Sequence, residues 1–248
     1  MSHYIITGTS RGIGEAVARK MLKPGNTLFC ASRTFNEELV ERAVSLGAKI
    51  YYYTADLSDP IAVAGFSDQI WEKILQAEVK CIALINNAGM ISPIGPVEKN
   101  DPVQLLMNIQ LNLLTPMLLT SAFLQHTAHW EIPKVIFNIS SGAASTAYSG
   151  LSAYCSSKAG IDMFTRTVAL EQSQALYPAK ILAFAPGIVE TAMQTEIRNA
   201  DIQSFPEKEQ FVMLHAGGHL SSPENVADVI AKSLFDDSIP QGSVIDIW

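Results

Sequence analysis

Tyr154 and Lys158 are the two residues of this sequence whose types and spacing most directly suggest chemistry. Residues four apart on a helix share one face, so a phenol and an ammonium would be neighbours there. A nearby positive charge favours the ionised phenol and lowers its pKa from about 10, which makes it a better proton donor at neutral pH. Such a pair arises easily by chance, so its meaning depends on the residues upstream.

A glycine-rich run, from Thr7 to Gly14, follows the first apolar segment and opens a helical pattern. Glycines allow a tight turn and a close approach of the backbone to a pyrophosphate, and the start of a helix supplies N–H groups and a positive dipole. A P-loop is excluded because no Gly-Lys-Ser or Gly-Lys-Thr follows. The run therefore predicts a dinucleotide-binding loop, with contacts expected from Gly8, Ser10, Arg11, Gly12, Ile13 and Gly14.

The end of the second apolar segment, at Ser32 and Arg33, bears on which dinucleotide is bound. An acidic residue at this place would bind the ribose 2′-hydroxyl of NAD, whereas a nearby arginine accommodates the 2′-phosphate of NADP. This position holds no acid, and Arg11 lies in the glycine-rich run. Two guanidiniums can flank one phosphate, so we predict NADP(H) as the cofactor. The alternative is that both arginines are solvated surface residues.

Apolar segments alternate with longer helical patterns along the whole chain. Strand candidates lie near residues 4–6, 27–31, 49–53, 81–85, 135–139, 180–184 and 244–246, and helical patterns occupy 12–23, 37–46, 60–76, 102–127, 152–176 and 223–235. This order predicts an α/β protein with a Rossmann-like, doubly wound parallel sheet of seven strands and helices on both faces. Residues 1–248 are expected to form one domain, with a substrate lid around 190–220.

Composition limits the classes of partner. Acidic residues outnumber basic ones by 24 to 17, the net charge is -7 and basic blocks are missing, which argues against nucleic acid or an anionic membrane. We find no apolar run as long as a membrane span and no secretory signal pattern. The three cysteines are widely separated, which favours a reduced, cytoplasmic location and no metal site.

Several motifs together resemble those of the short-chain dehydrogenase/reductase family, over nearly the whole length of the chain. Besides the glycine-rich run, they are Asp56-Leu57, Asn86-Asn87-Ala88-Gly89, a serine 13 residues before Tyr154, and Pro186-Gly187-Ile188-Val189-Glu190-Thr191. The resemblance implies further cofactor contacts from Asp56, Leu57, Asn87, Ala88, Gly89, Tyr154, Lys158, Pro186, Gly187, Val189 and Thr191.

The resemblance also implies a catalytic set of Asn112, Ser141, Tyr154 and Lys158. In the family the tyrosine donates a proton, the serine donates a hydrogen bond to the carbonyl oxygen, and the lysine lowers the tyrosine pKa and holds the nicotinamide ribose. The asparagine carbonyl holds a water that leads to the lysine. Here Pro116, four residues after Asn112, lacks the N–H that would bond this carbonyl in a helix. The alternative is an ordinary proline kink.

A narrower similarity, over residues 154–163, is to sepiapterin reductases and bacterial benzil reductases. It implies NADPH-dependent reduction of a small-molecule ketone, either an aromatic α-diketone such as benzil or the side-chain ketone of a pterin. Substrate contacts are expected from Ser141, Tyr148, Tyr154, Met193 and Asp246. Asp246 matches the residue that anchors the pterin in sepiapterin reductases, although it could equally do no more than end a strand.

Other interpretations stay open at this point. The same residues suit an alcohol dehydrogenase that runs in the oxidative direction, and a 3-oxoacyl reductase, although the latter would favour a basic surface for its acidic carrier. A protein of a different class, a non-catalytic regulator that senses NADP, could dispense with the serine, tyrosine or lysine, yet all three are present. The family resemblance also implies a homodimer or homotetramer.

Overall fold

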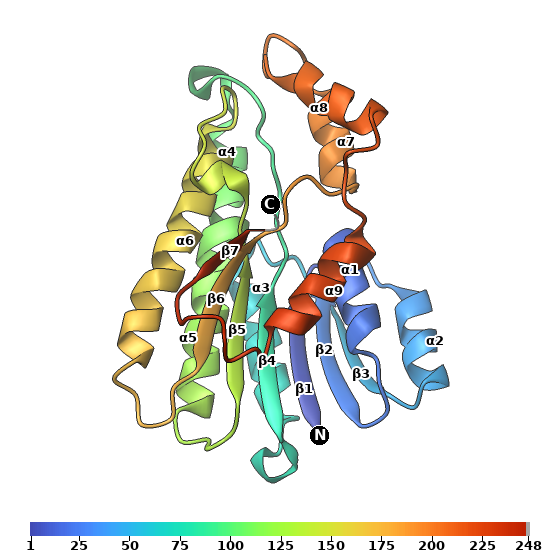
Figure 1. Cartoon of the computed structure of the whole chain (residues 1–248), viewed down its shortest axis with the longest axis vertical. Helices are drawn as coiled ribbons and strands as arrows, with labels where there is room; N and C mark the ends of the chain where they lie inside the picture. Colours follow the sequence, from blue (N-terminus) through green and yellow to red (C-terminus); the bar gives the residue numbers. More distant parts are fainter. Residues whose placement is uncertain (247–248) are drawn as a thin grey trace.

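Seven parallel strands form the centre of the structure, a computed structural model that describes residues 1–246 (Figure 1). Their order in the sheet is β3-β2-β1-β4-β5-β6-β7, and every neighbouring pair is parallel. The predicted doubly wound α/β fold is confirmed. The strands are β1 Ser2–Thr7, β2 Asn26–Ser32, β3 Lys49–Thr54, β4 Cys81–Asn86, β5 Lys134–Ile139, β6 Lys180–Ala185 and β7 Val244–Asp246.

Helices cover both faces of this sheet because its inner strands are apolar on both sides. On one face, side chains of α1 (Gly12–Met21), α2 (Glu37–Ser45) and α9 (Pro223–Ser233) share a core with the strands. On the other face the core partners are α3 (Pro60–Trp71), α5 (Thr115–Thr127) and α6 (Ser152–Gln172). Short 3₁₀ turns add η1 (Gln76–Glu78), η2 (Val97–Lys99) and η4 (Gly142–Ala144).

The helical pattern at 102–127 is interrupted in the structure. It consists of α4 (Pro102–Ile109), a π-helical turn η3 (Gln110–Leu114) and then α5. The N–H of Thr115 bonds to the carbonyl of Gln110, five residues back, just before Pro116. π-Helical turns of this kind are frequent at functional sites.

This same stretch corrects the expectation about membrane-spanning length. By length and composition alone, Pro102–Thr127 is apolar enough to cross a membrane. In the fold, however, Leu119 and Phe123 of α5 are buried against the sheet and α3. The stretch therefore forms α4, η3 and α5, and α5 packs in the helical layer on one face of the sheet.

The chain reverses its direction of winding between β1 and β4, which are neighbours in the sheet. Strands β2 and β3 lie on one side of this point, and β5 to β7 lie on the other. In open parallel sheets, ligands bind outside the carboxyl ends of the strands at such a point. The fold thus directs attention to the loops that follow β1 and β4.

The segment 190–220 contains two helices, α7 (Ala192–Asn199) and α8 (Lys208–Ala216). Figure 1 shows them above the carboxyl edge of the sheet. The two ends of the segment are joined by a parallel bridge between Val189 and Ser221. The Glu190 N–H bonds to the Ser221 carbonyl, and the Ser221 N–H bonds to the Ile188 carbonyl, both at 2.9 Å.

Candidate active site

A cavity of about 1130 Å³ opens at this edge of the sheet. It runs from the loop after β1, past the ends of β4 and β5, to the underside of α7. Within residues 1–246, Gly14 and Asn112 are the only predicted site residues that do not line it. The lining includes Gly8, Ser10, Arg11, Gly12, Ile13, Ser32, Arg33, Asp56, Leu57, Asn87, Ala88, Gly89, Ser141, Tyr148, Tyr154, Lys158, Pro186, Gly187, Val189, Thr191, Met193 and Asp246.

Gly14 lies behind the cavity wall, where it allows the glycine-rich loop to pack closely. A Cβ at this position would lie 2.2 Å from the Gly8 carbonyl oxygen and 2.3 Å from Nδ2 of Asn87. Gly8 has a φ of 74°, a left-handed conformation that other residues adopt only at a cost. The Asn87 amide donates to the carbonyls of Thr7 (2.9 Å) and Gly8 (3.2 Å), which ties the loop after β4 to the loop after β1.

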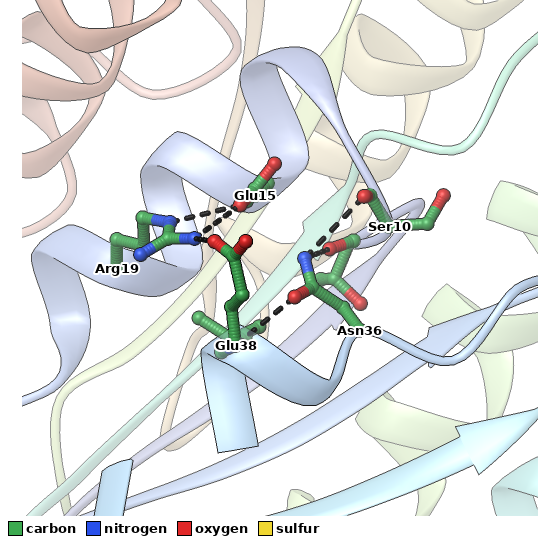
Figure 2. A network of polar contacts seen from close by, with 7 residues as sticks. Ser10, Glu15, Arg19, Asn36 and Glu38 are labelled. Atoms are coloured by element: carbon green, nitrogen blue, oxygen red, sulfur yellow. Dashed lines mark hydrogen bonds and ion pairs between the residues drawn. The ribbon is translucent and has the colours of Figure 1, made fainter. Parts of the chain in front are cut away.

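Asn36 is a residue of this loop system that the sequence analysis did not identify (Figure 2). Its amide donates to the carbonyls of Thr9 and Ser10, each at 3.3 Å. Its Oδ1 accepts the N–H of Leu39 at 3.0 Å and so caps α2. A helix-capping asparagine after the second strand was the available signal, but capping alone does not reveal the bonds to the first loop.

The end of β2 carries no acid and one accessible arginine. The Ser32 hydroxyl donates to the Thr34 carbonyl at 2.7 Å and also contacts the Tyr52 hydroxyl. No sequence motif indicated this contact with Tyr52. Arg33 is exposed and lies near Asp56. Burial would raise the pKa of Asp56, but hydrogen bonds from Ser58 and the charge of Arg33 outweigh it and hold this pKa below its usual value.

Three of the predicted catalytic side chains converge at the ends of β5 and α6. Ser141 begins η4, directly after β5, and Tyr154 and Lys158 lie one turn apart in α6. The Lys158 ammonium is 5.6 Å from the centre of the Tyr154 ring and donates to the Ile139 carbonyl at 2.8 Å. The Tyr154 hydroxyl lies 3.8 Å from the sulfur of Met193 on α7. The phenol thus points from α6 toward α7.

The expected direction of the Tyr154 pKa is wrong for this structure. Burial raises the pKa of Tyr154, and the hydrogen bond with the Ser141 hydroxyl opposes this only in part. Burial also lowers the pKa of Lys158 to about 8, against the raising effect of the Asp162 carboxylate. Both side chains are buried, and for each of them removal from water is the largest cause of the pKa shift.

Asn112 is buried in the π-helical turn, and its side chain binds the segment that follows β4. Its Oδ1 accepts the Met90 N–H at 2.9 Å, and its amide donates to the Met90 carbonyl at 2.8 Å. The same amide contacts Asn108 and Ser157. The side chain therefore serves the local framework, and a role of its carbonyl in a water relay stays a prediction.

The part of the cavity beside Tyr154 is apolar. Tyr154 belongs to a cluster that joins the walls of the cavity to the lid, with Ile91, Ala143, Leu151, Ile197, Phe205 and Phe211. Tyr148 packs edge-on against Phe211 of α8, with ring centres 6.0 Å apart. Asp246, at the end of β7, adds an acidic group to the lining. An apolar cluster of this kind, bordered by polar side chains such as Ser141 and Asp246, suits a small molecule with an apolar body.

Metal ligands do not gather anywhere in the described part of the chain. Across residues 1–246 no group of three or more histidine, cysteine, aspartate or glutamate side chains could hold a metal ion. His215 instead lies 3.3 Å from Glu190, and His126 stacks on Trp71. Besides Ser141, Tyr154 and Lys158, the polar side chains of the cavity lining include Arg11, Arg33, Asp56 and Asp246.

A glycine-rich loop at the switch point of a doubly wound sheet, beside a serine, a tyrosine and a lysine, defines an oxidoreductase that uses a nicotinamide dinucleotide. The chain belongs to the short chain dehydrogenase family, whose model matches residues 2–202. It is similar to "Benzil reductase ((S)-benzoin forming)" of Bacillus cereus, with 42% identity over 100% of this chain and 99% of that protein. The protein of the same name from Bacillus subtilis (strain 168) is 36% identical over 100% of this chain and 98% of that protein.

More distant similarities agree with this class. The sepiapterin reductase of Xenopus tropicalis is 31% identical over 84% of this chain and 81% of that protein. Among solved structures, the KRED1-Pglu enzyme matches with a TM-score of 0.83 and 24% identity over 99% of this chain and 100% of that one. The angucycline C-6 ketoreductase LanV with bound NADP matches with a TM-score of 0.78 and 23% identity, over 99% of this chain and 93% of that one. These solved structures show the same fold, while the family match and the full-length similarity to two reductases support a carbonyl reductase of the short chain dehydrogenase family.

Proposed function

We propose that this protein is an NADPH-dependent reductase of aromatic α-diketones such as benzil, with the side-chain ketone of a pterin as the second candidate. The observation that carries the proposal is the apolar pocket in which the phenol of Tyr154 faces the lid. The similarity to benzil reductases over the full length supports the first substrate class. Asp246 in the lining is the observation that favours a pterin, because a carboxylate suits its guanidine-like edge.

The residues that are present fit an NADP dinucleotide. The close packing of Gly14 on Gly8 places the start of α1 directly beside the cavity, where backbone N–H groups and the helix dipole favour a pyrophosphate. Arg11 and Arg33 line the adjoining part of the cavity and would hold a 2′-phosphate. Lys158 would hold the nicotinamide ribose, and the segment from Pro186 to Thr191 would hold the carboxamide.

The cofactor, when bound, supplies the hydride that reduces the carbonyl carbon. Tyr154 gives its hydroxyl proton to the carbonyl oxygen as that oxygen gains negative charge. Ser141 donates a hydrogen bond to the same oxygen, and a donor placed where charge develops stabilises the transition state. Lys158 in its charged form favours the phenolate that Tyr154 leaves behind. The backbone carbonyl of Asn112 would hold the water that returns a proton by way of Lys158.

A substrate screen tests the function directly. We expect the protein to oxidise NADPH in the presence of benzil, with weaker turnover of sepiapterin and of simple aldehydes. A sample with Tyr154→Phe measures the background. Turnover of sepiapterin alone would transfer the proposal to the pterin class, and loss of that turnover in Asp246→Asn would assign the pterin contact.

Arg33→Ala is expected to lower kcat/KM for NADPH by about tenfold to 100-fold, because a hydrogen bond to a charged group is worth that much. The value for NADH should stay within about twofold, since NADH has no 2′-phosphate. Steady-state rates with both cofactors measure this. Arg42→Ala, on the exposed side of α2, is the matched control. Equal losses with both cofactors would contradict the NADP assignment.

The reduction should weaken as the pH rises through about 8. Lys158 has a pKa lowered to about 8 by burial, so it is charged below that pH and neutral above it. We expect kcat/KM for NADPH, which reports groups of the free enzyme, to fall about tenfold per pH unit beyond this point. Asp162→Asn should move the fall to lower pH, because the Asp162 carboxylate raises the Lys158 pKa. A flat profile up to pH 10 would remove Lys158 from the mechanism.

Self-association through α4, α5 and α6 and a cytoplasmic location belong to the same proposal. The outer faces of these helices expose Val103, Leu106, Met117, Leu118, Met163 and Leu170. A wide apolar surface of this kind suits an interface between subunits. Light scattering of the protein as it elutes from a size-exclusion column gives the mass of the assembly.

The free cysteines Cys30, Cys81 and Cys155 support a reducing location.

A further inference from the structure

A buried cluster of three polar side chains lies behind the wall of the ketone pocket. Asn108 ends the second turn of α4, Asn112 lies in the π-helical turn, and Ser157 lies in α6. All three are almost fully buried, and Asn108 is 0% exposed. Burying an amide without hydrogen bonds costs free energy, so these buried side chains are expected to have hydrogen-bond partners within the protein.

Asn108 meets that demand by holding three consecutive peptide groups. Its amide donates to the carbonyls of Met90 and Ile91, each at 3.3 Å, and of Ser92, at 2.8 Å. Its Oδ1 accepts from the Asn112 amide at 3.0 Å and from the Ser157 hydroxyl at 3.1 Å. One side chain thus uses both its donors and its acceptor to join a loop to two helices.

The segment held in this way, Met90 to Ser92, forms one wall of the pocket next to the catalytic tyrosine. Met90 and Ile91 line the cavity, and Ile91 packs in the apolar cluster that contains Tyr154 and Phe211. The hydroxyl of Ser92 donates to Glu196 of α7. A displacement of this wall would therefore move both the apolar surface for a bulky ketone and the support of the lid.

The same cluster reaches the catalytic groups through the backbone. The single Ser157 hydroxyl proton is shared between two acceptors, the Tyr154 carbonyl at 2.9 Å and Asn108 Oδ1 at 3.1 Å, and the Asn112 amide donates to Asn108 as well as to Met90. Neither Asn108 nor Ser157 lines the cavity, so both act through other residues.

We propose that Asn108 is a positioning residue that holds Met90–Ser92 in place as the wall of the ketone pocket and thereby sets the preference for bulky over small ketones. The inference rests on the proposed ketone reductase function. This role differs from that of Asn112. The Asn112 amide donates to the carbonyl of Met90, whereas Asn108 is the only side chain among the described residues that donates to all three carbonyls of the wall.

Two variants separate the parts of this role. Asn108→Leu removes the bonds to the wall and to Asn112 and Ser157 at similar volume. Asn108→Asp keeps the acceptor for Asn112 and Ser157 but loses the donors to the wall. Lys134→Met is the matched control, because Lys134 is also buried and donates to two carbonyls, of Thr127 and Tyr177, at the opposite edge of the sheet.

The measurement compares kcat/KM for benzil with that for 2,3-butanedione, a small diketone. We expect both Asn108 variants to lower the benzil to butanedione ratio by about tenfold or more, as for other changes of pocket fit. The Kd of NADPH should stay within about twofold in both variants. Lys134→Met should leave the ratio unchanged even if it lowers thermal stability. An unchanged ratio in both Asn108 variants would overturn the proposal.

Hydrogen exchange of the protein with NADPH bound gives a second readout that needs no ketone. The Met90 amide, which donates to Asn112 Oδ1 at 2.9 Å, should exchange at least about tenfold faster in Asn108→Leu than in wild type, while Lys134→Met leaves it protected. If wild type reduces neither diketone, the proposed function falls, and the exchange result still decides the inference. Unchanged protection of the Met90 amide would then overturn it.

Discussion

Tyr154→Phe is expected to lower the turnover of a ketone by about 10³-fold, within the range that a positioned general acid supplies. The change removes only the hydroxyl, whose contacts are the Ser141 hydroxyl and the Met193 sulfur. The ring would keep its packing against Ile91 and Leu151, so the fold and the dinucleotide site should persist. Turnover at saturating NADPH and a fluorescence titration of NADPH measure the two effects separately.

The control for this experiment is the same chemical change at the far end of the molecule. Tyr177→Phe alters a tyrosine that precedes β6 at the edge opposite the cavity, and it should leave turnover unchanged. Near-normal turnover in Tyr154→Phe would show that another group donates the proton. Loss of NADPH binding in that variant would instead indicate a structural role for the hydroxyl.

Gly14→Ala is expected to weaken NADPH binding by about 100-fold or more, because the glycine-rich loop must move to admit a methyl group. The new Cβ would lie 2.2 Å from the Gly8 carbonyl oxygen, and this contact is with backbone, which cannot rotate away. Overpacking of this kind also costs about 1–3 kcal/mol of stability. A titration with NADPH and a thermal unfolding curve in its absence measure the two losses.

Gly65→Ala is the matched control for that substitution. Gly65 lies in α3, and a Cβ there would meet nothing within 4 Å. Alanine favours a helix over glycine by about 0.5–1 kcal/mol, so this variant should be slightly more stable and bind NADPH normally. If both variants bound NADPH equally well, the close packing of the loop would not be what positions it for the dinucleotide.

The strands and the edge where they meet were predictable because they depend on local pattern. Apolar runs such as residues 81–85 can be buried on both faces only as inner strands of a covered sheet, and the structure places them there. Gly8, Asn87 and Ser141 come just after the parallel strands β1, β4 and β5, and this places them at one edge of the sheet. Their convergence in one cavity follows from topology, whereas their chemical roles stay predictions.

The features that were missed depend on tertiary contacts. The direction of the Tyr154 pKa is set by burial, and spacing along a helix carries no information about burial. Asn36 and Asn108 bond to peptide groups 16 or more residues away, which no local motif predicts. The helices α7 and α8 are short, and the mixed composition of residues 190–220 gives no clear helical pattern.

The bridge between Val189 and Ser221 makes residues 190–220 a self-contained excursion from the sheet. The chain leaves and returns at one hydrogen-bonded point, so changes in the length or composition of the excursion need not propagate to β6 or α9. Loop closure adds little free energy as a loop lengthens, about 0.6 kcal/mol per doubling. Substitutions, insertions or deletions within residues 190–220 can therefore change the surface that faces Tyr154 while β6 and α9 keep their places in the fold.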